Sequence, residues 1–202
     1  MFEKFEALND EKKKTIINAS MKEFVKGGYE KASMNAVVET AGISKGSLFY
    51  YFENKKKLYL YLFEYCEKLI LNNAHRHLEN NESDFIKRME HVIKCNVSLL
   101  SDYPLVYGFV RSCKMEKSLN VVAEVQEIKA KTSEALFGEI YKDIDESLFR
   151  DEIDIKMAIY SIKATMFQLV HDAMRKNENN SEQLLKQIAD CRRFFEVALY
   201  KN

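Results

Sequence analysis

The feature that most limits the fold of this chain is its shortage of helix-breaking residues. Its 202 residues include one proline, Pro104, and only six glycines. Proline and glycine mark turns, and a chain built of strands needs many more of them than this. Hydrophobic residues make up 47% of the sequence and charged residues 31%, which is typical of a globular protein with a buried core. We therefore expect an all-α fold.

The sequence carries no pattern that indicates export or insertion into a membrane. The first ten residues, MFEKFEALND, lack the apolar core of a signal peptide, and no apolar run reaches the length that spans a bilayer. Four widely scattered cysteines form no CxxC pair, which favours free thiols in a reducing compartment: Cys66, Cys95, Cys113 and Cys191. We expect a cytoplasmic protein with no membrane partner.

Charge is unevenly distributed along the chain. Residues 1–57 hold 11 lysines and 8 acidic residues, a net charge of +3. The other 145 residues hold 20 basic and 23 acidic groups, a net charge of −3. If the protein binds a polyanion, this asymmetry indicates the N-terminal quarter as the part that binds it.

Capping residues and apolar spacing predict about nine helices. The first follows Asn9 and ends at Gly27-Gly28. Two short helices come next, one from Ser33 to a stop at Gly42, and one from Ser44 to Phe52. The remaining six are a long helix after Asn54 and the segments 83–100, 104–115, 119–142, 155–174 and 181–198.

Two short helices joined at a glycine and preceded by a longer one are typical of a helix–turn–helix. This motif places the N-terminal residues of its second helix in the major groove of DNA. A turn of 100° per residue puts Leu48, Phe52 and Ser44 on the inward side, with Tyr51 at its edge. The outward side then holds Lys45, Gly46, Ser47, Phe49 and Tyr50.

Two details of this region favour a nucleic-acid contact. Gly46 costs a helix roughly 0.5–1 kcal/mol relative to alanine, which is reasonable where a backbone must approach a base or phosphate closely. Lys55, Lys56 and Lys57 occupy the first turn of the next helix, where cations oppose the helix dipole. A nearby phosphate would reverse that penalty, and we expect Lys55 in particular to contact one.

The segment FVKGGYEKASMNAVVETAGISKGSLFYYFENKKKLYLYLF, residues 24–63, resembles the TetR-type bacterial transcriptional regulators. The positions that match the family pattern are Phe24, Gly28, Tyr29, Ala41, Gly42, Ser44, Lys45, Gly46, Leu48, Tyr51, Phe52, Lys55 and Leu58. The sequence departs from the pattern at Met34, where a hydroxyl residue is common, and at Phe49, where a tyrosine is usual. The resemblance covers about a fifth to a quarter of the chain.

The resemblance implies a DNA-binding site made of two kinds of contact. Backbone or phosphate contacts are implied for Ser44, Lys45, Gly46, Tyr51 and Lys55, and base-edge contacts for Lys45, Ser47 and Tyr50. Phe49 lies beside them, and Ser33 either binds a phosphate or only caps its helix. The expected domains are residues 1–54 for DNA binding and 55–202 for ligand binding and dimerisation.

The C-terminal part is expected to form a homodimer. One short recognition helix reads too few base pairs, so motifs of this type act in pairs on half-sites about one turn of DNA apart. Residues 155–174 are apolar on nearly every side, and 184–198 carry a broad apolar stripe. Both segments favour a symmetric helix bundle over burial within one chain, although for 155–174 both can hold.

The resemblance further implies a repressor that leaves a palindromic operator when a small apolar or aromatic ligand binds. The candidate pocket residues are Phe63, Cys66, Cys95, Tyr107, Arg111, Tyr160, Phe167 and His171. We expect no cofactor and no bound metal.

Three other functions fit the sequence less well. An enzyme is disfavoured, since the sequence lacks HExxH, GxGxxG, P-loop and nucleophile-elbow motifs, and His75 and His77 diverge on a helix. A thiol or metal sensor would need Cys66, Cys95 and Cys113 to converge. A helical adaptor that does not bind DNA would show no steep salt dependence with duplexes.

Overall fold

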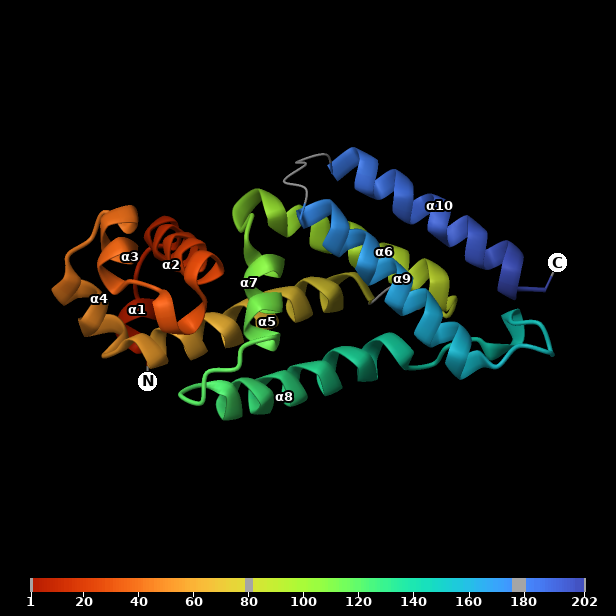
Figure 1. Cartoon of the computed structure of the whole chain (residues 1–202). Coiled ribbons are helices and arrows are strands. Elements are labelled where there is room, and N and C mark those ends of the chain that lie inside the picture. Colours follow the sequence, from red (N-terminus) through yellow and green to blue (C-terminus); the bar gives the residue numbers. More distant parts are fainter. Residues whose placement is uncertain (1, 79–81, 176–180, 202) are drawn as a thin grey trace. The chain divides into compact units, whose positions relative to one another are not determined.

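The computed structural model describes residues 2–78, 82–175 and 181–201, and confirms the all-α fold. Over these ranges it has ten α-helices and one 3-10 helix, with no strand beyond an isolated bridge between Phe149 and Tyr200 (Figure 1). The elements are α1 (Glu3–Glu6), α2 (Asp10–Lys31), α3 (Met34–Ala41), α4 (Lys45–Phe52), α5 (Lys55–Leu78), α6 (Phe85–Asp102), α7 (Val106–Lys114), α8 (Val122–Tyr141), η1 (Glu146–Leu148), α9 (Ile155–Arg175) and α10 (Ser181–Leu199). None of the described helices is long and apolar enough to cross a membrane.

The count of about nine helices missed α1 and η1, each a single turn. A helix this short has no stability of its own and no repeating apolar pattern to reveal it. Tertiary packing stabilises α1 instead, because the side chain of Phe5 is fully buried. The Phe5 ring lies 4.7 Å from that of Phe52 and 5.4 Å from that of Tyr61, centroid to centroid.

The predicted end of the first long helix at Gly27-Gly28 lies where the α2 backbone leaves helical geometry. Gly28 has φ 62° and ψ −174°, values that residues with a side chain rarely adopt. One further turn follows to Lys31. The break lets Tyr29 turn back into the core, where its ring packs edge-on against that of Tyr59 at 5.2 Å.

The chain divides into two compact units, each made of two stretches. One comprises Met1–Leu69 and Leu99–Ser133, and the other Ile70–Ser98 and Glu134–Asn202. The divisions fall inside α5, α6 and α8, so these long helices contribute to both units. A functional boundary after residue 54 remains a prediction.

The first unit contains the predicted helix–turn–helix and has an aromatic core. Phe24 of α2 packs on Tyr59 of α5 at 4.9 Å and on Phe109 of α7 at 6.1 Å between ring centroids. The Phe24, Tyr59 and Phe109 side chains are at most 1% exposed. This core fixes α2 against α5 and α7, and α3 packs on α2 while α4 packs on α1 and α3.

The second unit has its own apolar core, contributed mainly by α6, α9 and α10. Its buried residues include Phe85, Ile86, Met89, Ile93, Ile140, Phe149, Ala158, Ile162, Met166, Leu184 and Ile188. Of the segment 155–174, one stripe is therefore buried within the chain, while Met157, Tyr160 and Phe167 are exposed. Both interpretations of that segment thus remain compatible with the structure.

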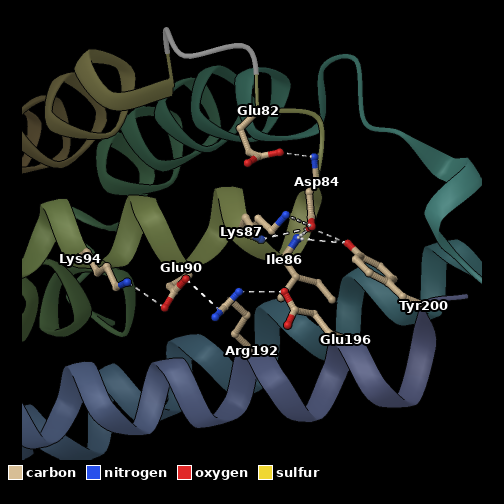
Figure 2. Close-up of polar contacts among 9 residues, drawn as sticks. All are labelled: Glu82, Asp84, Ile86, Lys87, Glu90, Lys94, Arg192, Glu196 and Tyr200. Atoms are coloured by element: carbon tan, nitrogen blue, oxygen red, sulfur yellow. Dashed lines mark hydrogen bonds and ion pairs between the residues drawn. The ribbon is translucent and has the colours of Figure 1, made fainter. Parts of the chain in front are cut away.

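A row of polar contacts joins α6 to α10 beside this core (Figure 2). The buried Glu90 carboxylate pairs with Lys94 at 2.9 Å and with Arg192 at 3.2 Å, and Arg192 also pairs with Glu196 at 3.0 Å. At the start of α6, Asp84 accepts a hydrogen bond from the Tyr200 hydroxyl at 2.8 Å. These contacts fix the register of α10 on α6, because each buried carboxylate would be costly without its partners.

Candidate nucleic-acid interface

Local capping chemistry builds the α3–turn–α4 motif. The Ser33 Oγ atom accepts a hydrogen bond from the Ala36 amide and begins α3, as predicted. Gly42 ends α3 in the left-handed conformation, with φ 65° and ψ 32°. Ser44 then caps α4, accepting from the Ser47 amide at 3.0 Å. The turn therefore has a defined geometry, and α4 leaves it in a fixed direction.

The two faces of α4 are as predicted except at two residues, Ser44 and Ser47, of which Ser47 is half-buried. Leu48 and Phe52 are at most 1% exposed, and Tyr51 is half-buried. Phe49 and Tyr50 are 36% and 60% exposed. Ser44 was expected on the inward side but is exposed, because its side chain turns back along the helix axis to cap the first turn.

Gly46 lies on the exposed face, in space that the chain leaves open. The nearest atom to a Cβ placed there would be the Ser44 Oγ atom, at 3.8 Å, which is an ordinary contact distance. Its φ is not in the left-handed region either. Neither internal packing nor backbone geometry therefore requires a glycine at this position, and its cost to the helix remains unexplained by the chain itself.

The polar groups of the exposed face already make contacts within the protein. The Ser47 and Ser44 hydroxyls are 2.8 Å apart and hydrogen-bonded. The Lys45 ammonium lies 5.9 Å from the centre of the Phe49 ring, and that of Lys4 lies 3.9 Å from the centre of the Tyr50 ring. No sequence pattern indicated that Lys4 would join this face, since α1 itself was not predicted.

Each of the three lysines that begin α5 has a partner in the protein. Lys57 pairs with Glu53, and Lys56 pairs with Glu124 at 2.6 Å. The Lys55 ammonium donates to the Glu30 backbone carbonyl at 2.9 Å and lies 5.1 Å from the Tyr29 ring centre. These partners offset part of the unfavourable interaction with the helix dipole, which weakens the case that the cluster needs a phosphate. Lys55, which forms no ion pair with a carboxylate among the described residues, stays the strongest candidate of the three.

The loop between α7 and α8 binds the end of α2 through Glu116. One carboxylate oxygen of Glu116 accepts from the Tyr29 amide at 3.0 Å, and the other accepts from the Lys117 and Ser118 amides at 2.9 Å each. Burial raises the pKa of this carboxyl, but the three amide donors outweigh burial and leave the pKa of Glu116 below its ordinary value. Next to it, the Glu30 carboxylate accepts from Ser118 and Asn120.

The candidate pocket residues are distributed over both units. Phe63 and Cys66 are fully buried in the first unit, where Tyr107 is half-buried and Arg111 is exposed. In the second unit Cys95 and His171 are half-buried, whereas Tyr160 and Phe167 are 61% and 40% exposed. Tyr160 and Phe167 therefore belong to the outer face of α9. Whether the eight surround one ligand stays a prediction.

Two of the four cysteines, Cys66 and Cys113, have the character of core residues, and Cys95 and Cys191 are half-buried. Cys66 and Cys113 are fully buried, and burial raises the pKa of the Cys66 thiol well above its ordinary value and that of Cys113 to about 12. A thiol with a raised pKa is a poor nucleophile and a poor metal ligand. Among the described residues, no three His, Cys, Asp or Glu side chains gather in a group that could hold a metal ion. The side chains of His75 and His77 lie outside the described residues.

Comparison with known proteins assigns the motif to a family. Residues 16–62, which run from α2 into α5, match the family described as "Bacterial regulatory proteins, tetR family". Among curated proteins, the chain is 24% identical over 155 residues to the biofilm operon icaADBC HTH-type negative transcriptional regulator IcaR of Staphylococcus aureus. That match covers 72% of this chain and 73% of IcaR. Residues 16–62 therefore belong to the tetR family of regulatory proteins, and the two matches together support a TetR-type, DNA-binding transcriptional regulator.

Solved structures with the same fold extend over nearly the whole chain. The ketosteroid transcriptional regulator KstR2 of Mycobacterium tuberculosis has a TM-score of 0.69 at 13% identity, with 96% of this chain and 97% of that one covered. FadR of Bacillus subtilis, in complex with stearoyl-CoA, has a TM-score of 0.64 at 17% identity, with 90% and 96% covered. The reported relatives are transcriptional regulators, not enzymes.

Proposed function

We propose that this protein is a repressor that binds a palindromic DNA operator as a dimer and releases it when a small apolar or aromatic ligand binds. The observation that carries the DNA-binding part is the exposed face of α4. It presents two large rings and an otherwise unexplained glycine to solvent, on a helix whose other face is fully buried. A negative regulator among the relatives supports repression over activation. We place this activity in the cytoplasm, where a regulator reaches chromosomal DNA.

The residues of this face divide into two roles in the proposal. Lys45, Ser47 and Tyr50 contact base edges, and Lys45 has the chemistry to bind the acceptors of a guanine. Gly46 and the free amide groups of the first turn of α4 approach a phosphate, helped by the dipole of the helix. Ser33, Ser44, Tyr51 and Lys55 complete the phosphate contacts, and Phe49 packs alongside Tyr50. Capping is the first role of Ser44 and Ser33, because each side chain already accepts a hydrogen bond from a backbone amide of its helix.

Dimerisation through α9 and α10 is supported by apolar side chains left in solvent. Met157 is 58% exposed, Phe194 66% and Val197 69%. Residues of α9, of α10 and of the segment just before α9 line an open, mostly apolar pocket of about 410 Å³. The lining residues are Ile153, Asp154, Met157, Ala158, Ser161, Phe194, Phe195, Ala198 and Leu199. A contiguous apolar surface of this kind favours burial against a second copy. Tyr160 and Phe167, on the same helix, suit this interface better than an internal pocket.

Two observations support a largely apolar ligand: the side chains of the candidate pocket residues, and two proteins of the same fold. Several candidate residues are apolar or polarisable, and Tyr107 and Arg111 add polar groups that could orient a bound molecule. Of the two proteins of the same fold, KstR2 is a ketosteroid transcriptional regulator, and FadR was solved in complex with stearoyl-CoA. We therefore propose a largely apolar effector that alters the spacing of the two α4 helices by shifting a conformational equilibrium.

The experiment that tests DNA binding compares two variants on two duplexes. A duplex pool is first selected with the parent protein, and a palindromic sequence and its scrambled counterpart are then measured in parallel. Tyr50→Ala should lose the preference for the palindrome, whereas Lys55→Ala should weaken both duplexes about equally. Lys142→Ala, an exposed lysine of the second unit, is the control. If both variants bind like the parent, α4 is not the DNA-reading element.

A further inference from the structure

The short helix α1 lies directly against the α4 helix that reads DNA in our proposal. Phe2 and Phe5 both pack on the ring of Phe52, at 5.7 and 4.7 Å between centroids. Phe5 also lies 5.9 Å from Tyr51. Because Phe5 is fully buried, the position of α1 relative to α4 is fixed within the first unit.

This packing places Lys4 on the exposed side of α4. Its ammonium lies 3.9 Å from the centre of the Tyr50 ring, close to the ring face, and both side chains are exposed. Of the two acidic residues of α1, Glu3 precedes Lys4 and is exposed, and Glu6 uses its carboxylate to accept a hydrogen bond from the Tyr61 hydroxyl. A cation is therefore presented beside Tyr50, with its helix already ordered in the free protein.

We propose that Lys4 is part of the DNA-binding surface and neutralises a phosphate next to the groove that Tyr50 enters. This inference rests on the proposed function, since it assumes that Tyr50 faces DNA. A lysine on an aromatic face keeps its hydration on the open side, so its ammonium can bind a phosphate without leaving the ring. The contact is independent of base sequence and supplies affinity rather than specificity.

The expected size of the effect follows from counterion release. Each phosphate neutralised contributes about 0.9 to the slope of log affinity against log salt concentration. Losing one contact per protomer, and so two per dimer, should reduce that slope by about 1.8. Between about 50 and 200 mM salt, the affinity ratio of parent to variant should then shrink about 12-fold.

The decisive variant is Lys4→Met, which keeps an apolar stem over the Tyr50 ring and removes only the charge. It should flatten the salt slope equally for the selected palindromic duplex and for its scrambled counterpart, while the ratio between the two affinities stays that of the parent. Lys4→Arg should restore the parent slope. Lys142→Ala removes one lysine from the second unit and should leave the slope unchanged.

Three outcomes separate this inference from the function on which it rests. A Lys4→Met slope equal to that of the parent and of Lys142→Ala would overturn the inference alone. A loss of sequence preference in Lys4→Met, with the slope intact, would make Lys4 a support for Tyr50 and also overturn it. If the parent itself binds neither duplex with a steep salt dependence, the proposed function has failed instead. Matching thermal unfolding of parent and Lys4→Met shows that the variant is folded.

Discussion

Replacing Glu116 with glutamine should destabilise the protein far more than the loss of one surface charge does. The Glu116 carboxylate serves three amide donors with its two oxygens. A glutamine side chain has one oxygen, so it must either abandon the Tyr29 amide or place an NH₂ group against the Lys117 and Ser118 amides. Hydrogen bonds to a charged acceptor contribute about 1.5–3 kcal/mol each, and water can replace part of this loss at a half-buried site. We expect Glu116→Gln to lower the free energy of unfolding by about 1.5–3 kcal/mol.

The measurement is urea unfolding at neutral pH, followed by circular dichroism and repeated towards acid pH. Glu127→Gln is the matched control, because Glu127 is exposed and its one ion pair among the described residues is with Lys131, one helical turn away, a solvent-screened contact that contributes little. The pKa of Glu116 is lowered in the folded protein, so its stabilising contribution is present above the ordinary glutamate pKa. That contribution is lost as the pH falls through the lower pKa of the folded state. The difference between parent and Glu116→Gln should therefore shrink in acid.

Two results would refute this reasoning about Glu116. The first is a Glu116→Gln variant as stable as Glu127→Gln at neutral pH, which would mean that water or the backbone replaces the three hydrogen bonds. The second is a stability difference that stays constant as the pH falls, which would assign the loss to packing rather than to the carboxylate charge. An unchanged urea m-value is required for either comparison, because a changed one indicates a different unfolded or native state.

Two further substitutions test the candidate sites. Gly46→Ala should raise the free energy of unfolding by roughly 0.5–1 kcal/mol and yet weaken binding to a selected duplex, because the added methyl group fits the chain but projects where DNA would approach; equal or tighter DNA binding by this variant would contradict the close approach. Phe194→Glu should yield a monomer by analytical ultracentrifugation at concentrations where the parent is a dimer, since it places a charge in the exposed apolar face of α10; a dimeric variant would move the interface elsewhere.

The parts of the fold that the sequence predicted are those that depend on nearby residues. Ser33, Ser44 and Gly42 act through amide and carbonyl groups at most four residues away, and all three have the predicted caps or turn. The division of α4 into a buried and an exposed face follows from helical period alone. Such features need no knowledge of where the rest of the chain lies.

The parts that could not be predicted depend on residues far apart in the sequence. Glu116 and Tyr29 are 87 positions apart, and no local pattern indicates that their atoms meet. Lys4 reaches the α4 surface only because Phe5 docks on Phe52. The inward placement of Ser44 was wrong for a local reason. The helical period alone ignores the hydrogen bond that the capping Ser44 side chain accepts from the Ser47 amide. The pocket residues depend on packing between helices, which amphipathic patterns do not determine.

The docking of α1 has a practical consequence for handling this protein. Phe2 packs on Phe52 and lies 4.7 Å from the Tyr61 ring, so the N-terminal segment is part of the folded surface from its second residue onward. An affinity tag joined to Phe2 would begin two residues before Lys4, and its own charges would alter measured salt slopes. A polyhistidine tag placed there could mimic or mask the contribution of a single lysine. Quantitative DNA-binding work on this regulator therefore calls for a tag that is not joined next to Phe2.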